Sequence, residues 1–369
     1  MPQSEAMAGD PTSQLRDAVV SLAHRDYDVR EFSLGAARIV RRAVGFDGVC
    51  VLTFDPATLL PTGEVVENGL PAAATARMAE IEVAATDFNK FSALAREPSN
   101  TARLSQATGG ELDRSLRHRE VRQPHGLGDE LRAALVSDST TWGAMTLLRG
   151  EDSAAFTADD AAVVSALSAQ IAEGLRRATV RAALAGSGEQ SDAPGLVVLQ
   201  GNEIALTNSV ADGLLAELLD GAPSGAKIPA VVAAVAGRAR ATAFGAALTD
   251  ARARVRTPAG RWLLVHGSTV GDGPETRTVV VLEQARTPEL APLIAAAYGF
   301  TERERLVTEM VAQGFNTNAI AERLYLSPWT VQDHLKAIFE KAGVRTRGEL
   351  VARIFFEHYA PRLAEAARG

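Results

Sequence analysis

The chain has little of several residue types, and each shortage excludes a class of protein. Only one of its 369 residues is cysteine, Cys50, so an internal disulfide is impossible and a reducing compartment is favoured. Aromatic residues make up 5%, and four of the 38 basic residues are lysines. The net charge of −7 is unlike the basic balance of a general nucleic-acid binder.

Long apolar runs and the common catalytic motifs are also missing. No uncharged apolar run approaches the roughly 18 residues of a membrane span, and the start of the chain lacks a secretory signal pattern. There is no GxxxxGK[ST] phosphate loop, no Cys/His cluster with zinc spacing and no GxSxG elbow. We therefore expect a cytoplasmic protein that is not an enzyme, binds no metal or cofactor and contacts no membrane.

The length and composition predict two or three folded domains in a soluble chain. Residues 1–15 are polar and small, and we expect a disordered tail there. The stretch at 185–193 has the composition of a linker. A linker helix at 286–298 and a tail at 361–369 complete the predicted boundaries.

The region at 16–184 alternates helix and strand signals. A capping box of Asp28 and Glu31 predicts the start of a helix, and the apolar run around Cys50 predicts a buried strand with a buried thiol. Two strand-like runs around DSTT predict a hairpin, and Thr157 precedes a long amphipathic helix.

The region at 194–285 predicts a second, smaller α+β unit. LVVLQGNEIALTN indicates two strands around a Gly-Asn turn, and a helix follows at Val210–Leu219. RVRTPAGRW predicts a further hairpin with its turn at Pro258–Gly260.

Residues 299–360 predict four short helices with clear start signals. Thr301 and Glu304 form a capping box, Asn316 and Ser327 cap the next two helices, and Thr346 begins the fourth. A tight turn joins the second and third helices, and the third has one apolar and one polar face. These features describe a helix-turn-helix, whose second helix enters the DNA major groove.

The polar face of the third predicted helix carries residue types that read bases. Gln332 suits adenine, Asp333 suits cytosine N4 and Lys336 suits guanine. Lys341, Arg345 and Arg347 lie where the third helix ends and the fourth begins, and they suit phosphate contacts. For His334 we favour packing between helices, with base contact as the alternative.

These residues resemble the DNA-binding domain of the LuxR family of bacterial transcription regulators. The shared elements are the TERE opening, Ile320-Ala321, Leu326-Ser327, Thr330-Val331, His334-Leu335, Lys341 and Gly343-Val344-Arg345. The resemblance implies base reading by Gln332, Asp333 and Lys336, and phosphate contacts by Thr330, Lys341 and Arg345.

Three positions depart from the family pattern. Trp329 stands where a basic residue is common, Asp333 where a neutral or basic one is usual, and Ala319 where glutamate is frequent. We expect Trp329 to pack or to stack on a sugar-phosphate edge. The operator sequence is therefore not transferable from the family.

The remaining chain is unlike three input domains of this family. It lacks the acidic pair and late lysine of a receiver, the aromatic set of an acyl-homoserine-lactone pocket, and the phosphate loop of the large ATPase type. Residues 16–184 instead resemble a GAF domain through WGAMTLLRG and the closing FTADDAAVVSALSAQIAEGL. Residues 194–285 resemble a PAS domain through PGLVVLQGNEIALTNSVADGLL.

The expected fold is therefore a multidomain α+β chain, with GAF-like and PAS-like antiparallel-sheet sensor domains before an all-α LuxR-type domain. The resemblance implies a homodimeric regulator that binds a promoter element of two half-sites and responds to a signal. Its further candidate partners are RNA polymerase and a small molecule whose binding residues the sequence does not identify. Two alternatives remain: a ligand-independent regulator with scaffold domains, and a signalling enzyme tethered to DNA.

Overall fold

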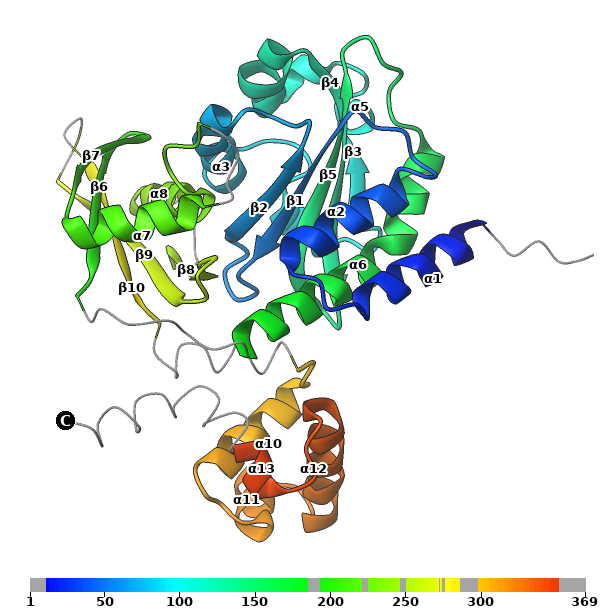
Figure 1. Cartoon of the computed structure of the whole chain (residues 1–369), viewed down its shortest axis with the longest axis vertical. Helices are drawn as coiled ribbons and strands as arrows, with labels where there is room; N and C mark the ends of the chain where they lie inside the picture. Colours follow the sequence, from blue (N-terminus) through cyan, green and yellow to red (C-terminus); the bar gives the residue numbers. More distant parts are fainter. Residues whose placement is uncertain are drawn as a thin grey trace, which may run out of the picture.

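The structure is a computed structural model, and it describes residues 11–184, 193–220, 225–245, 250–271, 273, 276–285 and 298–351. We name its three parts the first unit (11–184), the second unit (193–285) and the helical domain (298–351) (Figure 1). Each of the two units contains a five-stranded antiparallel sheet, and the described part of the helical domain contains helices alone. The multidomain α+β fold predicted from the sequence is confirmed.

The sheet of the first unit has the strand order β2-β1-β5-β4-β3. Its strands are β1 (Gly48–Phe54), β2 (Pro61–Glu67), β3 (Thr101–Arg103), β4 (Leu127–Ser137) and β5 (Thr140–Gly150). The hairpin predicted around DSTT joins β4 to β5. Asp138 and Ser139 both have positive φ, at 48° and 61°, which is the backbone of the tight turn that matches strand twist.

Helices cover both faces of this sheet. On one face lie α1 (Pro11–Ala23), α2 (Val29–Val40) and α6 (Ala158–Leu184), and on the other lie α3 (Thr75–Val83) and α4 (Phe91–Leu94) (Figure 1). The predicted capping box of Asp28 and Glu31 begins α2. Thr157 and Asp160 exchange hydrogen bonds at the start of α6, as its sequence led us to expect.

The predicted disordered tail at 1–15 is wrong for residues 11–15, which belong to α1. Polar composition indicated disorder, but α1 packs along α6 and buries Val19 and Ala23. The burial of apolar area against a distant helix stabilises this segment, and local composition does not reveal such a contact. Residues 1–10 lie outside the described chain.

The sheet of the second unit has the strand order β7-β6-β10-β9-β8. Its strands are β6 (Gly195–Gln200), β7 (Glu203–Thr207), β8 (Arg252–Arg256), β9 (Trp262–Val270) and β10 (Arg277–Gln284). Both hairpins predicted here are present, with turns at Gly201-Asn202 and at Pro258–Gly260. The predicted helix after the first hairpin is α7 (Ser209–Leu219).

Helix α8 (Ala230–Ala243) lies between the two units (Figure 1). It packs against β9 and β10 of its own sheet and against α3 and β2 of the first unit. Leu60 and Ala79 of the first unit belong to the same apolar cluster as the core of the second. An ion pair between Asp55 and Arg254, with Nη2 and Oδ1 2.6 Å apart, also joins the units.

The helical domain contains α10 (Glu302–Ala312), α11 (Thr317–Leu324), α12 (Pro328–Ala342) and α13 (Arg347–Val351). Its apolar core includes Val307, Ile320, Val331 and Ile338. Tyr298 packs against this core and also against the core of the first unit, so it marks the junction between the two parts.

Several predicted segments fall largely outside the described residues. Of the linker at 185–193 the structure describes residue 193, and of the linker helix at 286–298 it describes Tyr298, which lies in a turn. The last part of the predicted fourth helix and the tail at 361–369 also lie outside. No helix in the described ranges combines the length and apolar character that a bilayer span requires.

Candidate functional site

Helix α12 is held on the helical domain by one apolar face. Ser327 caps its first turn by accepting a hydrogen bond from the Thr330 N–H at 3.0 Å, and Pro328 occupies the first position, where a missing N–H costs nothing. The buried side chains are Val331, Leu335, Ile338 and Ala342. Their spacing of three or four residues leaves the opposite face open to solvent.

The turn before α12 depends on a left-handed residue. Tyr325 ends α11 with φ at 53°, and the Leu326 N–H donates to the Ala321 carbonyl at 2.9 Å. Two helices joined by a turn this short form the predicted helix-turn-helix. The Tyr325 side chain is 96% exposed beside the start of α12.

The three predicted base-reading residues share the open face of α12. Gln332, Asp333 and Lys336 are all exposed, and Trp329 precedes them on the same face with 76% of its surface exposed. Positions i, i+3, i+4 and i+7 lie along one side of a helix, so the four side chains form one continuous stripe. The fold thus places together an amide, a carboxylate, an ammonium and an indole.

The residues predicted to contact phosphates differ in whether their side chains already bind groups within the helical domain. Lys341 Nζ donates to the Gly299 carbonyl at 3.0 Å and pairs with Glu304 Oε2 at 2.7 Å. The guanidinium of Arg347 donates to the Phe315 carbonyl. The Thr330 hydroxyl lies 2.8 Å from the Ser327 hydroxyl, whereas Arg345 is exposed. Lys341 and Arg347 therefore already bind groups inside the domain.

The pairing with Lys341 also lowers the pKa of its partner, Glu304. Burial alone would raise the pKa of Glu304, but hydrogen bonds from Lys341 and from Thr301 outweigh it, so the pKa of this carboxyl lies below its usual range. Glu304 is also the second member of the predicted capping box of α10. One carboxylate thus links the start of α10 to the end of α12.

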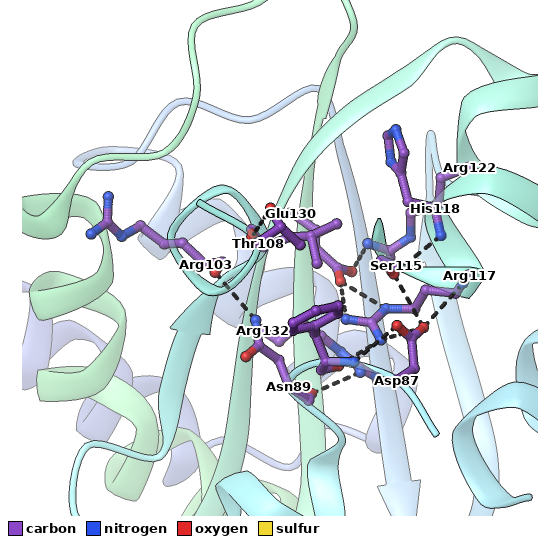
Figure 2. A network of polar contacts seen from close by, with 12 residues as sticks. Asp87, Asn89, Arg103, Thr108, Ser115, Arg117, His118, Arg122, Glu130 and Arg132 are labelled. Carbon is purple, nitrogen blue, oxygen red and sulfur yellow. Dashed lines mark hydrogen bonds and ion pairs between the residues drawn. The ribbon is translucent and has the colours of Figure 1, made fainter. Parts of the chain in front are cut away.

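A second group of polar residues is buried in the first unit, away from the helical domain. Figure 2 shows Glu130 between Arg117 and Arg122, with Asp87 on the far side of Arg117. Arg117 Nε donates to Glu130 Oε1 at 2.7 Å, and Arg117 Nη1 lies 2.9 Å from Asp87 Oδ2. Each of these arginine side chains is no more than 2% exposed. We call this set the buried charge network.

Arg132 extends the buried charge network along β4. Its Nη2 pairs with Glu82 at 2.8 Å, its Nη1 donates to the Asn89 carbonyl, and its guanidinium carbon lies 3.6 Å from the centre of the Phe91 ring. Burial lowers the pKa of Arg132 to about 10, although Glu82 opposes the shift. Burial also lowers the pKa of Arg122, and the neighbouring Arg117 and Arg132 add to that effect.

The network borders a cavity of about 130 Å³ on the α3 face of the first sheet. Arg122, Arg132 and Cys50 line it. The sequence predicted that the Cys50 thiol lies in a packed core, but Cys50 lines this cavity. Burial raises the pKa of Cys50 to about 12, Glu64 adds to the rise, and the arginines oppose it.

The sequence patterns did not identify any of these arginines as functional. One signal was available in β4, where Glu130 and Arg132 flank Leu131 at a spacing of two and so share one face of a strand that reads as buried. Two charged residues on one such face indicate a buried pair or a site. Asp87 and Arg117 carry no comparable signal, because they are 30 residues apart in the chain and no strand or helix spacing relates them.

No group of three or more His, Cys, Asp or Glu side chains in the described chain is arranged to hold a metal ion. Two candidate sites come from the features described above: the open face of α12, and the cavity beside the buried charge network.

Comparison with known proteins identifies two of the domains. Residues 299–354 match the family model described as bacterial regulatory proteins, luxR family, and residues 28–175 match that of the GAF domain. These matches confirm the LuxR-type and GAF domains predicted from the sequence. The resemblance of residues 194–285 to a PAS domain stays a prediction.

Curated relatives match over a limited stretch. The transcriptional regulatory protein UhpA of Salmonella typhimurium is 44% identical over 71 residues, which cover 19% of this chain and 36% of that protein. The transcriptional regulatory protein DesR of Bacillus subtilis is 37% identical over 78 residues, which cover 21% of this chain and 39% of that protein. The chain thus spans little more than a third of the length of these relatives.

Among solved structures, the GAF domain/HD domain protein from Geobacter sulfurreducens is 20% identical and covers 40% of this chain and 91% of its own. Its TM-score of 0.29 is too low to establish a shared arrangement.

Proposed function

We propose that the protein is a transcription regulator that binds double-stranded promoter DNA through α12 and is not an enzyme. The observation that carries the proposal is the stripe of Trp329, Gln332, Asp333 and Lys336 on the open face of a helix whose other face is packed. A helix presented in this way fits the major groove, and the amide, carboxylate and ammonium side chains of the stripe are types that pair with base edges. The luxR-family match of residues 299–354 supports the same reading.

The proposed mode of binding is a cytoplasmic homodimer on two half-sites, which contacts RNA polymerase at a promoter. Each helical domain would place one α12 in a major groove, and the spacing of the two copies would set the spacing of the half-sites. The GAF domain would receive the signal, and the signal would shift the population between different arrangements of the two helical domains. Tyr298, which packs on the cores of both the first unit and the helical domain, supports such a link.

The proposed DNA-binding residues fall into three groups according to their contacts in the structure. Gln332, Asp333 and Lys336 are free of the packed core and are proposed to read bases. Arg345 and Trp329 are exposed and are proposed to contact the backbone. Lys341, Thr330 and Arg347 are proposed to position the reading helix, and a phosphate contact by Lys341 would compete with Glu304.

Electrophoretic retardation of the DNA upstream of the protein's own coding sequence tests the proposal. Lys336→Ala and Gln332→Ala should each weaken specific binding by about 1–3 kcal/mol, which is about 5- to 150-fold. Lys227→Ala is the matched control, because it removes the same ammonium from an exposed site in the second unit and should leave the affinity unchanged. Retention of wild-type affinity by both α12 variants would show that this face does not read DNA.

The proposed dimer has a separate test. Sedimentation equilibrium of the full chain should give twice the monomer mass at the concentration that retards DNA. A monomer mass at that concentration would contradict two-half-site binding by a preformed homodimer.

A further inference from the structure

The cavity of the first unit is closed in part by the second unit. Strands β1, β2 and β5 and helix α3 supply most of its lining, while Ala230 and Arg238 come from α8 of the second unit. The site is therefore incomplete in the first unit alone. Anything bound in it would touch the helix that joins the two units.

The size and lining of the cavity limit its guest. Its volume of about 130 Å³ is close to that of engineered cavities of about 150 Å³ that hold benzene. Phe54 and Phe91, whose rings meet edge to face 5.8 Å apart, line it together with Met78 and Leu70. Such a lining favours a compact apolar body about the size of one ring.

Two buried arginines that line the cavity each have an N–H group without an acceptor in the described chain. Arg122 Nε and Arg132 Nε are buried, and no hydrogen-bond partner for either lies among the described residues. Both side chains are 2% exposed, and both line the cavity. Guanidinium groups form their strongest hydrogen bonds with anionic acceptors, so a guest that carries a carboxylate suits a cavity lined by these two arginines.

The charges around the cavity favour an anionic guest. Five cationic groups and four carboxyl groups lie in or beside it: Lys90, Arg117, Arg122, Arg132 and Arg238 against Glu64, Glu82, Asp87 and Glu130. Burial raises the pKa of Glu64, and the Thr75 hydroxyl opposes the rise only in part. The formal charges of these groups leave one positive charge in excess, which a monoanion would balance.

We propose that this cavity binds a small apolar monocarboxylate of about the size of benzoate, with its carboxylate on Arg122 and Arg132 and its apolar body against Phe54 and Phe91. Ala230 and Arg238 of α8 complete the site, so the guest bridges the two units. The inference deepens the proposed function by naming the class of signal that the regulator binds.

Isothermal titration calorimetry of the full chain tests the proposal without any substitution. Benzoate, cyclohexanecarboxylate and 3-methylbutanoate are each compared with their amides, which keep the shape and lose the charge. At least one acid should bind about 10- to 100-fold more tightly than its amide, because hydrogen bonds to a charged group are stronger than neutral ones. The proposal is overturned if no acid binds more tightly than its amide.

Two variants locate the site. Arg122→Gln should weaken binding of the acid about 10- to 100-fold, and Ala230→Leu, which extends a side chain of α8 into the cavity, should abolish it. Arg149→Gln is the matched control, since Arg149 pairs with Asp160 outside the cavity lining of the same unit. Unchanged affinity in Ala230→Leu would exclude the cavity as the site, even if Arg122→Gln fails to fold.

The calorimetry is done without DNA and the retardation assay without the acid, so the two proposals are tested independently. Retention of DNA binding together with loss of acid preference would overturn the inference alone. Acid binding without DNA binding would overturn the proposed function alone.

Discussion

Two five-stranded sheets with the same pattern of strand order lie on either side of α8 in this chain, and of the residues described in these two units only those of the first unit include buried charged side chains (Figure 1). Beside the sheet of the first unit lie a cavity and the buried charge network. The sheet of the second unit is covered by α8, whose buried residues are all alanine, valine or glycine. Strand order therefore does not decide which kinds of side chain are buried beside a sheet of this type.

The difference comes from what covers each sheet. The helices over the cavity face of the first sheet are short, and the segments outside them bring Asp87 and Arg117 together. In the second unit, small side chains let α8 lie so close to β9 that a Cβ on Gly267 would come within 2.9 Å of Val235. Close packing leaves no room for a guest between α8 and β9, whereas the space between α3 and the first sheet holds the cavity.

The largest expected effect is on the buried charge network. Glu130→Gln should lower the free energy of unfolding by about 3–5 kcal/mol, because Arg117 and Arg122 would both lose the carboxylate that they share. Urea unfolding at pH 7, followed by circular dichroism, measures the loss.

The control for this substitution is Glu120→Gln. Glu120 pairs with Arg77, but these side chains are 40% and 39% exposed, so the loss should stay below about 1 kcal/mol. Equal losses in the two variants would mean that burial of the network does not set its contribution.

A smaller effect is expected from packing in the second unit. Gly267→Ala should destabilise by about 1–3 kcal/mol, because the new methyl would meet Val235 and Ala239 of α8. Thermal unfolding followed by calorimetry checks the sign.

Gly213→Ala, in the same unit, should stabilise the protein where Gly267→Ala destabilises it. Gly213 lies within α7, and nothing approaches the position of its Cβ within 4 Å, so alanine should stabilise the helix by about 0.5–1 kcal/mol. If both substitutions stabilise, α8 is not closely packed on β9.

The smallest effect concerns two carboxyl groups whose pKa values move in opposite directions. Burial raises the pKa of Glu64, so the unfolded chain ionises first and the carboxyl reduces stability once the pH rises above about 4.5. Burial also acts on Glu217, but hydrogen bonds from Arg261 and Thr257 outweigh it and lower its pKa. Glu217 therefore adds stability above its unfolded pKa, and that stability is lost as the pH falls through the folded pKa.

Stability measured against pH separates the two groups. Glu64→Gln should stabilise the chain at pH 7 and have little effect at pH 3. Glu217→Gln should destabilise it at pH 7 by about 0.5–1 kcal/mol, and this difference should shrink as the pH falls below about 4.5. A loss of stability in Glu64→Gln at pH 7 would show that Glu64 is ionised and paired in the cavity.

Sequence patterns predicted the local features of all three parts. The capping boxes of α2 and α10, the hairpins and the stripe on α12 are each encoded within about ten residues, so spacing alone revealed them. The pairing of Lys341 with Glu304 joins residues 37 positions apart, and the sequence left Lys341 available for phosphate. The helix at 11–15 was missed for the same reason, because α6 stabilises it from a distant part of the chain.

The sequence by itself determined the helical domain and the residues on its reading face, since helix caps and apolar spacing act between near neighbours. Only the tertiary structure decided that Glu130 would lie between two arginines, that Cys50 would face a hollow and that α8 would close it. These features require segments far apart in the chain to meet. Their energies come from desolvation and close packing, which depend on the assembled surroundings and not on local order.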